Sequence, residues 1–110
     1  MAYIGENAVG VWANFRGGNV HLHDDYRVSS ITDNGTGDYT VNYDVTLDNN
    51  KYAAVGSVGD EGGFSGGYNP ERMVKFSNYT TTTIRFRVRS STGGAADENA
   101  CSYMLVGDIE

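Results

Sequence analysis

The chain has 110 residues with 39% hydrophobic and 20% charged side chains, and its formal net charge at pH 7 is −6. This length allows one domain with a modest core and is too short for a layered enzyme architecture. The acidic charge opposes the counterion release that dominates nucleic-acid binding, and no apolar run is long enough to span a membrane.

The composition favours an all-β fold. Fifteen glycines, eight tyrosines and a single proline are typical of short strands joined by turns. No window combines apolar residues at helical spacing with capping residues. Turn signals recur at intervals of about eight to twelve residues, which predicts an antiparallel β-sandwich, jelly-roll-like, with about seven short strands. We expect the domain at residues 8–110, after an N-terminal extension of residues 1–7.

The first predicted strand spans residues 9–15. It places Val9, Val11, Ala13 and Phe15 on one face and Trp12 on the other. Further strands are predicted at residues 20–22, 26–32, 38–44, 51–58, 80–90 and 100–107, and residues 72–77 are another candidate for a short strand. No linker or internal repeat divides the chain.

The hairpin at residues 26–43 is the most distinctive predicted element. Asn34-Gly35 offers the pair of positive-φ residues that tight hairpin turns need. After the turn, Tyr39, Val41 and Tyr43 share one face. The pattern predicts a hairpin with one buried face.

Three segments closely resemble a small β domain that recurs at the C-terminal ends of tail fibres and tail proteins of tailed bacteriophages. They are residues 12–15 (WANF), 26–43 (YRVSSITDNGTGDYTVNY) and 52–56 (YAAVG). The family pattern is a W-x-N-F strand, a V-S-S-I-T-D-N-G-T-G-D-Y-T-V-N-F hairpin and a Y-x-x-V strand, and the resemblance spans roughly residues 8–107. It implies a homotrimeric host-recognition module at the fibre tip of the virion, made in the host cytoplasm and without catalytic residues.

The glycine-rich segment 59–69 is the first candidate binding site. Its five glycines disfavour a regular strand, and binding residues concentrate on loops carried by a rigid scaffold. Aromatic rings can stack on sugars while polar groups bond to hydroxyls. The candidate glycan-binding residues are Asp60, Glu61, Phe64, Tyr68 and Asn69. The alternative is a loop whose aromatic side chains pack on the sandwich. Residues 92–99, with oxygens from Asp97, Glu98 and Asn99, form another candidate loop.

The predicted strand 80–90 has a second candidate site on its outer face. Apolar side chains alternate there with three arginines, Arg85, Arg87 and Arg89. Guanidinium groups bind anionic sugars or phosphates in bidentate fashion. The alternative is that they keep a sheet surface soluble, or pair with Asp44 or Asp48 of a neighbouring subunit.

His21 and His23 should project from one face of a strand, with Leu22 on the other. Around a three-fold axis the two imidazoles of each subunit would supply six nitrogens, which suits an octahedral transition metal. The alternative is a pair of solvated or hydrogen-bonded histidines beside Asp24 and Asp25. The phage family usually carries other residues at these positions, so the resemblance does not imply the metal, and we expect no other cofactor.

Nothing in the sequence indicates an enzyme. The lone Cys101 lies in an apolar run and is expected to be a buried thiol, because a nucleophile needs an activating base. Nucleophile-elbow, zinc-protease, Walker and dinucleotide motifs are absent from the sequence.

We therefore predict a distal tail-fibre domain that adheres to a host surface glycan, either polysaccharide or lipopolysaccharide. The alternatives are a structural trimerising cap without receptor contact and a non-catalytic domain of a polysaccharide depolymerase. The predicted homotrimer buries part of the 9–15 region. Nucleic-acid binding and membrane insertion are not expected.

Overall fold

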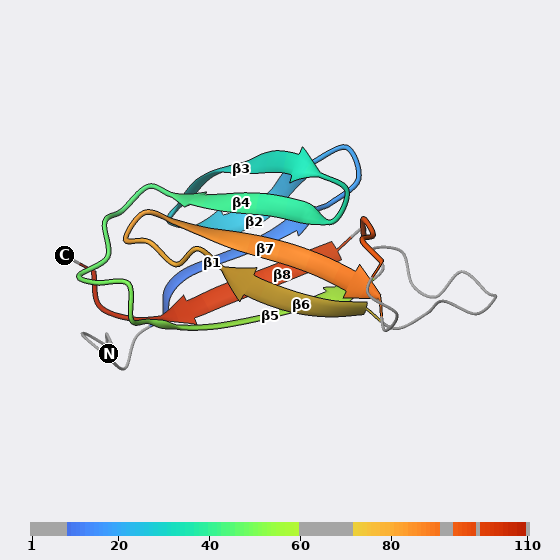
Figure 1. Cartoon of the computed structure of the whole chain (residues 1–110). Coiled ribbons are helices and arrows are strands. Elements are labelled where there is room, and N and C mark those ends of the chain that lie inside the picture. The colour runs from blue at the N-terminus through green and yellow to red at the C-terminus, as the bar shows by residue number, and fades with distance from the viewer. Residues whose placement is uncertain (1–8, 60–71, 91–93, 99, 110) are drawn as a thin grey trace.

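The computed structural model describes residues 9–59, 72–90, 94–98 and 100–109. Two four-stranded antiparallel sheets lie face to face (Figure 1). Sheet A has the order β2 (His21–Tyr26), β1 (Val9–Arg16), β8 (Ala100–Val106), β5 (Ala53–Gly59). Sheet B has the order β3 (Val28–Gly35), β4 (Asp38–Tyr43), β7 (Thr83–Ser90), β6 (Arg72–Ser77). The predicted all-β sandwich is confirmed. No helix that could cross a membrane occurs in these ranges.

The chain forms three in-sheet hairpins, β1–β2, β3–β4 and β6–β7, and its other four connections each lead from one sheet to the other. The sharpest connection is the single residue Arg27, which has a positive φ of 66° and separates β2 from β3. The bounds of the strands predicted at residues 20–22 and 26–32 are wrong at this corner, because β2 runs to Tyr26 and β3 begins at Val28. β2 continues through Asp24 and Asp25 because both pair with β1. Asp24 pairs with Asn14 and is exposed, whereas Asp25 pairs with the buried Ala13, is half-buried and accepts a hydrogen bond from the Val28 amide at 3.1 Å.

The core comes from alternate residues of the four inner strands. Side chains that are at most 7% exposed include Val11, Ala13 and Phe15 of β1, Tyr39, Val41 and Tyr43 of β4, Ile84, Phe86 and Val88 of β7, and Cys101, Tyr103 and Leu105 of β8. The predicted alternations in residues 11–15, 39–43 and 84–88 are confirmed. Both sheets therefore give one face to a shared apolar interior, and their other faces remain accessible.

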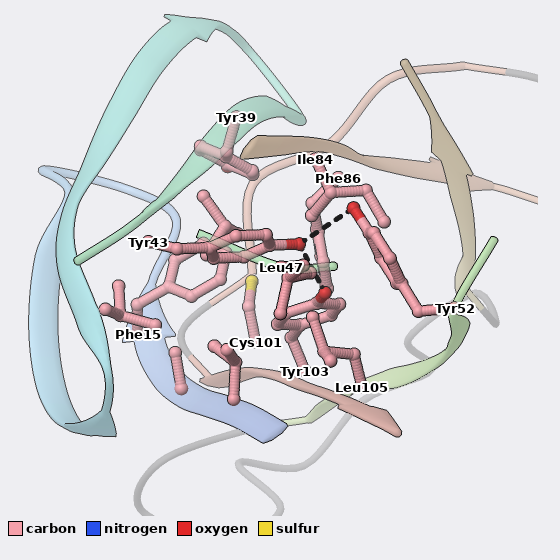
Figure 2. Close-up of a cluster of buried hydrophobic side chains, with 14 of the residues drawn as sticks. Phe15, Tyr39, Tyr43, Leu47, Tyr52, Ile84, Phe86, Cys101, Tyr103 and Leu105 are labelled. Atoms are coloured by element: carbon pink, nitrogen blue, oxygen red, sulfur yellow. Dashed lines mark hydrogen bonds between the residues drawn. The ribbon is translucent and has the colours of Figure 1, made fainter. Parts of the chain in front are cut away.

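Tyrosine hydroxyls join the two sheets inside this core (Figure 2). The hydroxyl of Tyr43 lies 2.6 Å from that of Tyr103 and 3.2 Å from that of Tyr52, which is 3.0 Å from the carbonyl oxygen of Thr80. Each hydroxyl has one hydrogen to donate. The chain of donors therefore runs from Tyr103 to Tyr43 to Tyr52 to the Thr80 carbonyl, and each buried hydroxyl is satisfied.

The β3–β4 hairpin is present, but its turn is not the predicted one. Gly35 pairs with Asp38, so the two central turn residues are Thr36 and Gly37 rather than Asn34 and Gly35. Asn34 remains in the strand, at a bulge, where its side-chain amide donates to the Thr40 hydroxyl at 2.8 Å. Gly37 supplies the positive φ, 62°.

Gly37→Ala should destabilise the fold more than Gly35→Ala. A Cβ at position 37 would lie 2.6 Å from the Ala96 carbonyl oxygen and 2.7 Å from that of Val88, whereas a Cβ at position 35 meets no atom within 4 Å. Both glycines have positive φ. We expect losses of about 3 and about 1 kcal/mol, respectively, measured by urea denaturation. Equal losses would show that the close approach at Gly37 is unimportant.

Alkaline pH should destabilise the domain through its buried tyrosines. Burial raises the pKa of Tyr39, Tyr43, Tyr52 and Tyr103 above the usual value. Above about pH 10 the unfolded chain loses these protons while the folded chain keeps them, so the free energy of unfolding falls as pH rises. Denaturant titrations across this pH range measure the slope of the free energy of unfolding against pH. Tyr43→Phe should flatten it, and a wild-type stability independent of pH up to about pH 11 would contradict the prediction.

Candidate functional site: the two outer faces of the sandwich

The candidate residues of the first predicted binding loop lie outside the described residues; they are Asp60, Glu61, Phe64, Tyr68 and Asn69. In the other candidate loop, Asn99 lies outside them as well, but Asp97 and Glu98 are described. A carboxylate oxygen of Asp97 accepts hydrogen bonds from the Gly37 amide and the Tyr39 hydroxyl. Glu98 pairs with Arg72 at 3.2 Å. Both acidic side chains therefore have structural partners.

The predicted histidine pair lies on β2, the edge strand of sheet A. The rings of His21 and His23 are 5.3 Å apart, and both side chains are exposed. They share one face, as predicted. Within the described ranges, no group of three or more His, Cys, Asp or Glu side chains could hold a metal ion. One chain thus offers a pair of imidazoles only, and the metal site around a three-fold axis stays a prediction.

The outer face of sheet B is covered by a network of short polar side chains. The Asn42 amide donates to the Ser30 hydroxyl at 3.1 Å and to the Thr32 hydroxyl at 2.9 Å. Asn34 bonds to Thr40 in the same way. These residues come from β3 and β4. In β4 the alternate positions fill the core, whereas β3 is an edge strand in which only Val28 is buried. The network holds hydroxyl and amide groups in fixed orientations on a rigid surface.

A polar groove of about 460 Å³ crosses this face. It is lined by Asn34, Thr40, Asn78, Thr80, Thr83 and Arg85. The hydroxyls of Thr80 and Thr83 lie 2.8 Å apart on one wall. These residues belong to β3, β4, β7 and the segment between β6 and β7, so only the folded chain assembles the groove.

Arg85 contributes an ion pair to the groove. Its Nε and one terminal nitrogen donate to the two carboxylate oxygens of Asp38 at 2.8 and 2.5 Å. These hydrogen bonds hold the pKa of Asp38 below its usual value. The pair uses two of the five guanidinium N–H groups, and the Arg85 side chain is 36% exposed, so other donors can reach a ligand.

The sequence had indicated Arg85, Arg87 and Arg89 as one outward stripe, and all three do alternate with buried residues. Arg85 pairs with Asp38 of the same chain, and pairing of the stripe with Asp44 or Asp48 of a neighbouring subunit stays a prediction. The threonine and asparagine residues of the groove were missed. Alternation opposite Tyr39 and Val41 could have indicated Thr40, but not the residues that other strands contribute.

The centre of the outer face of sheet A is apolar, and polar residues such as Asn14, Ser102 and Asp24 lie beside it. Cross-strand pairing places Tyr26, Trp12, Met104 and Val55 in one row across all four strands. Their exposed fractions lie between 37% and 53%. A groove of about 590 Å³ runs between Trp12, Met104 and Val55. The prediction that Trp12 faces away from the core is confirmed, whereas the row depends on strand register and was not predicted.

No protein-family model, curated protein or solved structure matches this chain. The resemblance to the phage tail-fibre domain therefore remains an expectation from the residues that carry it. In the fold, residues 12–15 lie in β1, residues 26–43 run from the end of β2 through β4, and residues 52–56 lead into β5. The resembling segments thus contribute to both sheets.

Cys101 should be unreactive in the folded protein. Its side chain is fully buried, and burial, together with the nearby charges of Glu98 and Asp97, raises its pKa to about 12. Because only the thiolate reacts, a thiol reagent at about pH 8 should modify the native protein at least about a hundredfold more slowly than the urea-unfolded chain. Equal labelling rates would show that the thiol is accessible.

Proposed function

We propose that this chain is the distal domain of a phage tail fibre, part of the virion, and that it adheres to polysaccharide or lipopolysaccharide on the host surface. The resemblance of residues 12–15, 26–43 and 52–56 to fibre-tip domains supports the virion assignment. The polar groove on sheet B is the observation that carries the adhesion. Its hydroxyl, amide and guanidinium groups match the donors and acceptors of a glycan.

The groove suits a sugar because its polar groups are held before the ligand arrives. Sheet residues fixed by mutual hydrogen bonds lose little conformational entropy on binding. Lys75, Arg87 and Arg89 project from the same face of sheet B, since their neighbours in β6 and β7 point inward. These cations would attract the anionic groups of lipopolysaccharide.

A second candidate function is a trimerising cap that fixes the subunits of a fibre without touching the receptor. The apolar row on sheet A favours it, because such a surface suits contact between protein subunits. The two functions use opposite faces of the sandwich. One domain can therefore serve both, and we include a homotrimer in the proposed function.

Arg85→Gln tests the adhesion. The change removes a charged donor from the groove, and hydrogen bonds to charged groups contribute about 1.5–3 kcal/mol. We expect binding to an immobilised panel of bacterial polysaccharides and lipopolysaccharides to weaken by about tenfold or more. The matched control is Arg89→Gln, which removes the same charge from the same strand outside the groove. Because Arg89 also contributes to the attraction of anionic groups, the loss of binding in Arg85→Gln beyond that in Arg89→Gln measures the groove. Arg87 is a poorer control because its Nε is buried.

Thermal melting must show that both variants are folded, since Asp38 loses its partner in Arg85→Gln. Equal binding by folded Arg85→Gln and the parent would exclude the groove as the binding site. A parent protein that oligomerises but retains no glycan of the panel would favour the cap.

A further inference from the structure

Exposed apolar side chains gather on one side of this protein. Among the described residues, seven large hydrophobic side chains are at least 36% exposed. Five of them project from the outer face of sheet A: Trp12, Tyr26, Val55, Met104 and Val106. Of the other two, Met73 lies on β6 and Tyr79 follows β6. Soluble monomers rarely expose a large contiguous apolar patch.

The five side chains form a continuous surface. Trp12 is the cross-strand neighbour of both Tyr26 and Met104, and Met104 is the neighbour of Val55. Since adjacent strands are about 4.8 Å apart, this row is about 14 Å long. Val106 extends the surface along β8. We call this set the apolar face.

The two polar side chains next to the centre of the apolar face are paired with each other. Asn14 and Ser102 are the adjacent outward residues of β1 and β8, and the Asn14 amide donates to the Ser102 hydroxyl at 2.9 Å. Burial of a polar group is costly mainly when it loses its partner. Covering this part of sheet A would leave that hydrogen bond intact, and the outward positions of β8, at residues 102, 104 and 106, carry no charge.

We propose that copies of this chain pack against one another through the apolar face. The chain carries a net charge of −6, so two copies repel each other in general. At the outer face of sheet B they would bring Lys75, Arg87 and Arg89 of one copy near those of the other. The centre of the apolar face carries no charge, so two copies can meet there with fewer opposing like charges. The Arg27 guanidinium, 4.5 Å from the centroid of the Tyr26 ring, lies at the edge of the face.

The composition of the face also fits a permanent partner of the same kind. Interfaces between permanently associated copies are more apolar than transient ones, and Trp, Tyr and Met are enriched at interface cores. A separate partner that arrives by diffusion is usually steered by complementary charges, which the centre of this face lacks. Flat sheet faces of this type pack well against each other at about 10 Å.

The apolar face would be the contact surface of the homotrimer in the proposed function, and this contact does not depend on glycan binding. It narrows the predicted subunit contact from residues 9–15 to the outward side chains of β1, because Val11, Ala13 and Phe15 fill the core of their own subunit. The polar groove on sheet B would face outward in every copy. Several grooves on one assembly would strengthen adhesion through avidity.

Met104→Lys tests the interface against a matched control, Met73→Lys. Both methionines are exposed on an outer sheet face, 42% and 57%, but only Met104 lies on the apolar face. Analytical ultracentrifugation of the parent at micromolar concentrations should give a multiple of 11.9 kDa. Met104→Lys should raise the dissociation constant at least tenfold or yield monomers, and Met73→Lys should behave as the parent does.

Trp12 provides a second readout that needs no substitution. It is the only tryptophan of the chain and lies at the centre of the face. In the assembled parent, acrylamide should quench its fluorescence at least severalfold less than in monomeric protein. The quenching measurement tests the proposed interface even if Met104→Lys fails to fold.

Any of three results would overturn the proposed interface: a parent that is monomeric at these concentrations, an oligomer in which Trp12 is freely quenched, or an unchanged dissociation constant in folded Met104→Lys. Glycan binding is scored separately. A monomeric Met104→Lys that still binds glycans supports both the interface and the groove, whereas an oligomeric Arg85→Gln that no longer binds them shows that the two faces act independently.

Discussion

Each inner strand of this sandwich can give only every second side chain to the core, and that constraint governs the rest of the structure. β4 uses Tyr39, Val41 and Tyr43 to fill the interior. Thr40 and Asn42, between them, must then face outward. The same holds for β1, β7 and β8. Core packing therefore decides which residues form the outer faces, and function has to be built from those that remain.

The two outer faces of the sandwich differ in the polarity of their side chains. Sheet B presents hydroxyls, amides and cations, while sheet A presents two aromatic rings, a methionine and two valines. Inside, the hydroxyl chain through Tyr43 and Tyr103 ties β4 of one sheet to β8 of the other. A packed interior of this kind has low compressibility. The proposed glycan groove and the proposed subunit interface lie on opposite faces and use different residues.

The hairpin that carries the resemblance to phage fibres is also rich in long-range contacts. Gly37 lies against the backbone of Ala96, Asp38 binds Arg85, and the Tyr39 hydroxyl donates to Asp97. Three consecutive residues thus have partners far along the chain. Their identities reflect tertiary requirements as well as the local turn, which is a physical reason for such a distinctive string of residues.

The sequence by itself determined the class of fold, most of the strands and which side chains point inward, because the two-residue period of a strand is a local property. It also indicated a buried Cys101 and an outward Trp12. The tertiary structure alone decided where the hairpin turns, that the chain passes from one sheet to the other at Arg27, and which side chains become neighbours. Asn14 and Ser102 are 88 positions apart in the chain, and Asp38 and Arg85 are 47 apart. Strand order and register bring such residues together, and they arise from hydrogen bonding and packing across the whole domain. The apolar face and the polar groove are therefore products of the fold rather than motifs of the sequence.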